Sequence, residues 1–233
     1  MSTDRDVSSG DREGLAEQAY VRLRDDIVSL VLAPGAPLSE RTLSASLGLG
    51  LTPVREAIRR LALEKLAVIY PRRGTFVSAI DIGDEGRLTE IRLELEGFAA
   101  ALAAERATDD ERTHLLALVA DLEAHGDSLA LQNELDGRVH RAIYAAAHND
   151  FLESTLTHYS NLALRIWNSG LQGQGASSVH HASQRLVVEA IARRDPAGAR
   201  AGAEQHLRGF SEQVRSALHA RTARTPSAFA ARG

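Results

Sequence analysis

The 233-residue sequence contains no cysteine and no long apolar run. Without cysteine the chain can form neither a disulfide framework, nor a thiolate nucleophile, nor a zinc site with sulfur ligands. No stretch approaches the roughly 20 apolar residues that cross a bilayer. The N-terminal residues are polar and acidic, whereas a signal peptide would be basic and then apolar. We therefore expect a cytoplasmic protein with no membrane partner.

The sequence also lacks a net basic charge, since 27 basic and 31 acidic side chains leave a formal charge of -4. This value argues against a nucleic-acid partner, because affinity for phosphate depends on clustered lysine and arginine. The charge is unevenly distributed, however. The first 80 residues carry 11 basic and 10 acidic side chains, and the remainder carries 16 and 21. Residues 38–78 hold seven basic against three acidic side chains, so an acidic C-terminal half masks a basic segment.

The fold class is predicted to be mainly α. Short helices and strands are expected in the first part of the chain, and long helices in the second. Glycine, proline and β-prone runs occur before about residue 80, and alanine- and leucine-rich segments with helical periodicity follow it. The predicted organisation is a disordered N-terminus (1–14), a winged helix-turn-helix DNA-binding domain (15–79), a helical effector-binding and dimerisation domain (80–222) and a flexible tail (223–233).

Three helices are predicted in the first half. Apolar residues at helical spacing indicate a helix over about 15–32, which Pro34-Gly35 ends. Ser39 is placed to cap a short helix over 40–47 that ends at Gly48. Thr52 as N-cap and Pro53 as first helical residue would open a third helix that runs to about Glu64. Two short helices joined by a tight glycine-containing turn make a helix-turn-helix.

A β-hairpin is predicted directly after these helices. The β-prone runs 67–70 and 75–78 flank the turn Pro71-Arg72-Arg73-Gly74. A helix, a helix-turn-helix and a basic hairpin together form a winged helix. In such a domain the recognition helix enters the major groove by its N-terminal end, where Arg55 can reach a guanine edge.

The other predicted DNA contacts follow the same geometry. Thr52 and the neighbouring N–H groups would meet phosphate at the start of the recognition helix. Arg41 would contact backbone or base, and the tip of the hairpin would reach the minor groove. A solvated basic face is the alternative for isolated arginines, but the ordered set favours DNA. The predicted DNA-binding residues are Arg41, Thr52, Arg55, Arg72, Arg73 and Gly74.

The second half is predicted to be an antiparallel helical bundle. Thr108 and Glu111 form a capping box at one helix start, in which each side chain satisfies a free backbone N–H. The glycine-rich segment 170–178 separates two of the later helices. The predicted helices lie near 84–106, 109–125, 129–147, 151–169, 178–194 and 196–222.

At these residues the chain resembles the GntR-type bacterial transcription regulators. The resemblance rests on Leu38-Ser-Glu-Arg-Thr-Leu-Ser, on Thr52-Pro-Val-Arg-Glu-Ala-Ile-Arg-Arg-Leu and on Pro71-Arg-Arg-Gly. The helical remainder resembles the FCD ligand domain of the FadR-like branch. The resemblance implies a homodimer that binds double-stranded operator DNA and is not an enzyme. Two positions depart from the family pattern: Gly50-Leu51 replaces Ser/Thr-Arg, and Lys65 replaces a glycine.

A metal site is suggested by Asp136 and His140, which are four residues apart and project from one face of a helix. The resemblance implies two further histidines around a divalent metal, zinc or nickel. His206 matches the last ligand position, and Gln184 stands where the third histidine is expected. A glutamine carbonyl is a weak, hard donor that lowers affinity for zinc or nickel. His181 could substitute, although it lies one helical turn away.

The alternative for this cluster is that Asp136 and His140 simply pair and that His206 is a satisfied polar group. The resemblance also places Arg92 in the effector pocket, where a guanidinium would grip a carboxylate in a bidentate manner. A small acidic metabolite is the effector class that this implies. An intrahelical pair with Glu96 is the other possibility for Arg92. The predicted effector-binding residues are Arg92, Asn161, Arg165 and Gln184.

Two functions follow from these features. The first is a ligand-responsive DNA-binding regulator, and we favour a repressor. The alternative is a metal-dependent hydrolase that uses Asp136, His140 and His206, because three ligands with an open position can activate water. The second lacks a glutamate at metallohydrolase spacing and leaves the winged helix without a purpose.

Overall fold

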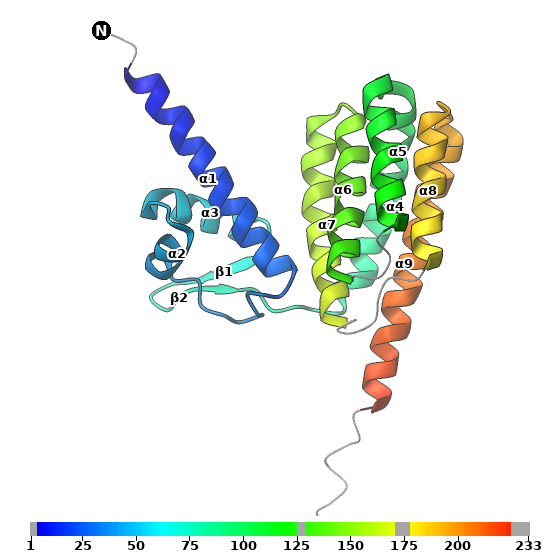
Figure 1. Cartoon of the computed structure of the whole chain (residues 1–233). Helices are drawn as coiled ribbons and strands as arrows, with labels where there is room; N and C mark the ends of the chain where they lie inside the picture. Colours follow the sequence, from blue (N-terminus) through cyan, green and yellow to red (C-terminus); the bar gives the residue numbers. More distant parts are fainter. Residues whose placement is uncertain (1–3, 125–128, 171–177, 225–233) are drawn as a thin grey trace, which may run out of the picture. The chain divides into compact units, whose positions relative to one another are not determined.

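The computed structural model describes residues 4–124, 129–170 and 178–224 (Figure 1). The chain divides into two compact units, one of residues 1–81 with 164–169 and the other of residues 82–163 with 170–233. The predicted loop between Gly170 and Ser178 lies outside the described residues, and so does the predicted tail beyond Arg224.

The N-terminal unit is a winged helix. Its two strands pair antiparallel, with Ala67 opposite Val77 and Tyr70 opposite Gly74. Ser39 caps the second helix by accepting a hydrogen bond from the Thr42 backbone N–H at 3.4 Å, as predicted. The elements are α1 (Asp4–Val28), α2 (Glu40–Leu47), α3 (Leu51–Leu63), β1 (Ala67–Tyr70) and β2 (Gly74–Val77).

The core of this unit lies between α1 and α3. The apolar residues of each helix recur at helical spacing, so that one face of each is buried against the other. The Tyr20 hydroxyl donates a hydrogen bond to Glu64 at 2.7 Å, and burial together with this carboxylate raises the pKa of Tyr20 to about 12. The buried apolar side chains include Tyr20, Leu23, Ile27, Val54, Ala57, Ile58 and Leu61.

Several boundaries differ from the sequence prediction: α1 ends at Val28 and not near residue 32, β2 covers Gly74–Val77 and not 75–78, and two helix starts are shifted. The first helix begins at Asp4, so the prediction of disorder over 1–14 is wrong from residue 4 onward. The segment lacks proline, and an exposed glycine costs a helix only about 1 kcal/mol. The third helix begins at Leu51 with Gly50 as N-cap, so Thr52 lies inside the helix and is not its cap. Pro53 is compatible with this because N–H groups of the first turn have no intrahelical partner.

Lys65 adopts the left-handed backbone conformation, with a φ of 60°. It follows the last turn of α3, and its N–H donates to the Ala62 carbonyl at 3.2 Å. A non-glycine residue in this region is disfavoured by contact between its Cβ and the backbone. The lysine that departs from the family pattern therefore carries backbone strain at the end of the recognition helix.

Replacing Lys65 with glycine is expected to stabilise the winged helix by about 1 kcal/mol, because glycine reaches positive φ without a Cβ penalty. The side chain is exposed, so its removal disturbs no packing. Lys65→Ala is the matched control, since it removes the lysine chain but keeps the Cβ. Thermal unfolding should show a higher midpoint for Lys65→Gly alone. Equal midpoints for the two variants would contradict the assignment of strain.

The C-terminal unit is an antiparallel helical bundle, as predicted. The capping box is present: the Glu111 carboxylate accepts from the Thr108 N–H at 2.7 Å, and the Thr108 hydroxyl accepts from the Glu111 N–H at 3.2 Å. The helices are α4 (Asp84–Arg106), α5 (Asp109–Ala124), α6 (Leu129–Ala146), α7 (Asp150–Gly170), α8 (Ser178–Ala192) and α9 (Pro196–Arg224).

A continuous apolar core joins these helices. α9 packs against α4 and α8, and α5 packs against α6 and α8. The alanine-rich face of α4 is fully buried, which lets neighbouring backbones approach closely. Within the described residues, no helix is both long enough and apolar enough to cross a membrane. The core includes Ala99, Ala103, Leu115, Val119, Val139, Tyr144, Leu156, Val187, Ile191 and Ala199.

Candidate functional site

The first candidate site is the exposed surface formed by α2 and the start of α3 in the winged helix. Thr52 and Arg55 lie in the first turns of α3 and are exposed, and Arg41 is exposed near the start of α2. The buried residues of α3 face α1, so packing of the apolar stripe turns the polar stripe outward. Helix N-terminal N–H groups and exposed arginines on one surface are the donors that phosphates and guanine edges accept from.

Arg55 is not free on this surface, because it is paired with Glu40 of α2. The Arg55 Nε lies 3.1 and 3.0 Å from the two Glu40 carboxylate oxygens, and its Nη2 lies 2.7 Å from Oε2. The hydrogen bonds from Arg55 lower the pKa of the Glu40 carboxyl, which stays ionised. The sequence prediction named Arg55 but missed Glu40, whose partner is fifteen residues away on another helix.

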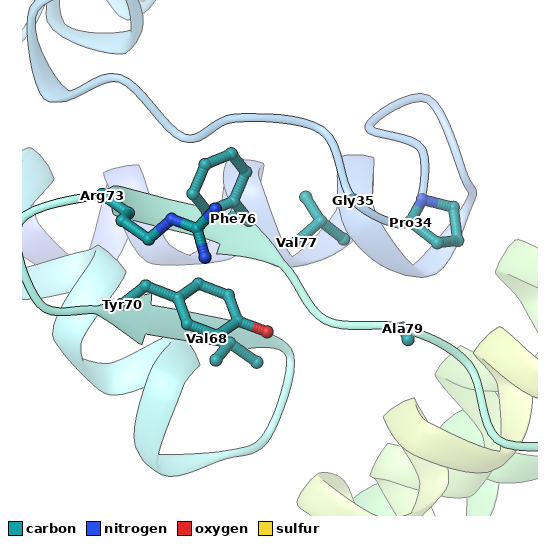
Figure 2. A pocket seen from close by; sticks show the side chains of 8 residues that line it. All are labelled: Pro34, Gly35, Val68, Tyr70, Arg73, Phe76, Val77 and Ala79. Carbon is teal, nitrogen blue, oxygen red and sulfur yellow. The ribbon is translucent and has the colours of Figure 1, made fainter.

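The hairpin places its basic residues at the turn between β1 and β2. Arg72 and Gly74 both have positive φ, 62° and 99°, and all of Arg72, Arg73 and Gly74 are exposed. Figure 2 shows the Arg73 side chain beside the Phe76 ring and above Tyr70, at the rim of a hollow of about 440 Å³. The Tyr70 and Phe76 rings meet edge to face, with centroids 5.9 Å apart. The turn of the hairpin therefore presents two exposed arginines beside an aromatic pair.

The second candidate site is a cluster of polar residues inside the helical bundle. Asp136, His140 and His206 each offer one ligand atom, and these atoms lie within 4.8 Å of one another. The His140 and His206 ring centroids are 5.3 Å apart. The structure thus brings together the three predicted metal ligands, from α6 and α9, in a spacing that one ion could bridge. This observation supports a metal site.

Glu96 of α4 is a member of this cluster that the sequence prediction assigned only as a possible partner of Arg92. Its Oε1 accepts from the Arg92 Nε at 2.6 Å, and its Oε2 lies 3.3 Å from His140 Nδ1. The Tyr144 hydroxyl also lies 3.3 Å from His140 Nδ1. Because Nδ1 is engaged by these groups, His140 presents Nε2 toward Asp136, 3.8 Å from its Oδ2.

The charges of this cluster are coupled. Burial alone would raise the pKa of Glu96, but Arg92 and His140 outweigh it and lower the pKa to about 2. Burial would lower the pKa of His140, but the carboxylates of Asp136 and Glu96 outweigh it and raise this pKa. Glu96 is therefore a permanent anion that fixes the orientation of both its partners.

A small cavity of about 10 Å³ opens against this cluster, which is room for roughly one water-sized atom. Gln184 of α8 lines it and is 1% exposed, and within the described part of the chain neither its amide nitrogen nor its amide oxygen has a hydrogen-bond partner. A buried amide left without partners costs about 1–3 kcal/mol. The donor set and the orphaned amide together fit a bound ion or a small polar group. Its lining residues are Glu96, Ala100, His140, Ile143, Tyr144, Gln184, Val187, Ala203 and His206.

The other predicted effector residues lie apart from this cavity. Arg92 is 5% exposed, does not itself line the cavity, and pairs with Glu96, which corresponds to the intrahelical pair considered from the sequence. Asn161 is buried, and its amide nitrogen has no hydrogen-bond partner among residues 4–124, 129–170 and 178–224. Arg165 lies in the segment 164–169 that groups with the N-terminal unit, and it donates a hydrogen bond to the Ser78 hydroxyl at 2.6 Å. The side chain of His181 lies outside the described residues.

Comparison with known proteins yields two family matches. Residues 15–77 match the bacterial regulatory proteins of the gntR family, and residues 87–209 match the FCD domain. An uncharacterized HTH-type transcriptional regulator in an unstable DNA locus of Streptomyces ambofaciens is 30% identical over 206 residues, which are 84% of this chain and 83% of that protein. The HTH-type transcriptional repressor RspR of Escherichia coli K12 is 27% identical over 206 residues, 85% of this chain and 88% of that protein.

Solved structures agree on the fold. The Escherichia coli McbR/YncC structure superposes with a TM-score of 0.74 at 24% sequence identity, over 89% of this chain and 98% of that chain. None of these matches supports the alternative of a metal-dependent hydrolase. The chain belongs to the GntR family of bacterial regulatory proteins, in the branch that carries an FCD domain, and is a DNA-binding transcription regulator rather than an enzyme.

Proposed function

We propose that the protein is a cytoplasmic, homodimeric repressor that releases its operator when a small carboxylate binds the helical domain. The single observation that carries the DNA-binding part is the ordered set of exposed arginines on the winged helix. Two copies would place two recognition helices in successive major grooves of a pseudo-palindromic operator. A relative of this chain is named a repressor, which favours repression over activation.

The proposed contacts to DNA are of two kinds, those to base edges and those to the phosphate backbone. Arg55 would read a guanine through paired N–H donors, whereas Thr52 and the N–H groups at the start of α3 would bind phosphate. Arg41 would contact the backbone or a base beside the recognition helix. Arg72, Arg73 and Gly74 would enter the minor groove from the hairpin. Phosphate contacts give affinity and register, and Arg55 gives sequence preference.

The helical domain would hold a divalent metal through Asp136, His140 and His206, with the Gln184 amide oxygen as a fourth donor. The clustered ligand atoms and the unpartnered amide support this assignment. When bound, the ion would supply a positive charge that attracts the carboxylate of an acidic effector. Glu96 holds His140 with Nε2 toward Asp136, and Arg92 holds Glu96 ionised. The cavity of about 10 Å³ is too small for a metabolite, so effector binding must repack its walls.

The direct test is fluorescence anisotropy with a labelled duplex from the region upstream of the protein's own gene. We expect saturable binding that exceeds binding to a scrambled duplex by at least about 1,000-fold and weakens with salt. Adding a panel of two- to six-carbon carboxylates should release the operator for one class of acid. Equal affinity for operator and scrambled DNA would refute sequence-specific regulation from this region.

A further inference from the structure

The pairing of Arg55 with Glu40 leaves one edge of the guanidinium unused. Arg55 offers its side-on edge, Nε and Nη2, to the carboxylate of Glu40. The planar guanidinium carries five N–H donors in a fixed fork, so its end-on edge, Nη1 with the second proton of Nη2, remains available. No other hydrogen bond to Arg55 is found among the residues that the structure describes.

This free edge has the geometry that guanine recognition requires. Two parallel N–H donors match the O6 and N7 acceptors of guanine in the major groove. An unpaired arginine side chain samples many rotamers and must lose that freedom on binding, whereas a guanidinium already held on one edge loses less. Glu40 is the first residue of α2 and Arg55 lies in α3, so the pair also ties together the two helices of the helix-turn-helix.

Glu40 favours guanine recognition through Arg55, but its own negative charge weakens the general affinity for DNA. Its carboxylate is ionised, is about 37% exposed and lies on the surface proposed to face DNA. A negative charge there repels the phosphate backbone, and this repulsion acts on every sequence equally. Positioning Arg55 acts only where a guanine is present. Positioning therefore raises the ratio of specific to non-specific binding, whereas the repulsion lowers both affinities by a similar factor and leaves this ratio nearly unchanged.

We propose that Glu40 is a positioning residue for operator recognition, which holds Arg55 by its side-on edge so that its end-on edge meets guanine. This inference rests on the proposed function, in which Arg55 reads the operator. A simple surface ion pair that only joins α2 to α3 is the competing explanation. Such a pair would affect stability slightly and would leave sequence preference unchanged.

The experiment compares Glu40→Gln and Glu40→Ala with the wild type on operator and scrambled duplexes, over a series of salt concentrations. Glu56→Gln is the matched control, because it removes the same charge from the exposed face of α3, and no side-chain hydrogen bond or ion pair joins Glu56 to Arg55 in the described structure. We expect both Glu40 variants to lower the ratio of operator to scrambled affinity by roughly 5- to 20-fold, with scrambled binding itself slightly tighter. Glu56→Gln should tighten both and leave the ratio nearly unchanged.

A double-mutant cycle separates positioning from charge. If Glu40 acts through Arg55, Glu40→Ala should have no effect on the ratio in an Arg55→Ala background. Far-ultraviolet circular dichroism and thermal unfolding would verify that each variant is folded, and the glutamine variant preserves the side-chain shape. If Arg55→Ala abolishes operator preference while both folded Glu40 variants keep the wild-type ratio, the role of Glu40 is overturned alone. If Arg55→Ala keeps operator preference, Arg55 does not read the operator, and that part of the proposed function fails together with the role of Glu40.

Discussion

Replacing Arg55 with alanine is expected to lower affinity for the operator by roughly 10- to 100-fold for each recognition helix that contacts a guanine. The loss should be far smaller on scrambled DNA, because only the generic attraction of one positive charge is removed. In a dimer both half-sites lose the contact, so the combined effect approaches the square of this factor. Anisotropy titrations with both duplexes at one fixed salt concentration would measure it.

The matched control for this variant is Arg59→Ala. Arg59 lies one turn further along α3 and is also exposed. Its loss should weaken operator and scrambled binding by similar factors and reduce the salt slope by about one. The Arg55–Glu40 pair is exposed and contributes little to folding, so both variants should unfold near the wild-type temperature. Operator preference that survives Arg55→Ala but not Arg59→Ala would move base recognition along the helix.

Local signals in the sequence were sufficient to predict the elements of the fold. Helical periodicity, the cap at Ser39 and the turn Pro71 to Gly74 each act over a few residues, and the structure confirms the helices and the hairpin that they predicted. The predicted start of α3 differs from the observed one because both Gly50 and Thr52 are residue types that can serve as N-cap. Gly50 adopts the extended cap conformation, and Pro53 fits any position in the first turn.

The candidate sites were only partly predictable, because several of their contacts join residues on different helices. The sequence predicted Asp136 and His140 as a pair because they are four residues apart on one helix. His206 was predicted only from the family resemblance. The contact from Glu96 to His140 joins α4 to α6 and has no sequence signal beyond the spacing of Glu96 from Arg92. Likewise, no local pattern indicated that Glu40 would meet Arg55. Long-range polar pairs depend on how the helices pack against one another, and local patterns in a single sequence do not predict that packing.

Replacing Gln184 with histidine is expected to tighten zinc binding by roughly 100-fold. Four-ligand zinc sites bind with about 10–16 kcal/mol, which is roughly 3 kcal/mol for each ligand. An imidazole nitrogen is a much better zinc donor than an amide oxygen. Gln184 already lines the cavity shared with His140 and His206, and its amide makes no hydrogen bond with the residues that the structure describes. The substitution therefore replaces a weak donor with a stronger one and breaks no hydrogen bond found within the described residues.

Competition with a chromophoric zinc chelator would measure this affinity, and the metal content after dialysis would confirm it. Gln184→Ala is the control for the present role of the amide: if its oxygen is a ligand, zinc affinity should fall several-fold. His206→Ala should cost about 100-fold by the same reckoning of roughly 3 kcal/mol for each ligand. Tighter binding should also appear as zinc-dependent thermal stabilisation, because an ion that binds only the folded state shifts unfolding by mass action. Unchanged zinc affinity in Gln184→His, with His206→Ala strongly weakened, would place Gln184 outside the coordination sphere and leave its unpartnered amide as a contact for the effector instead.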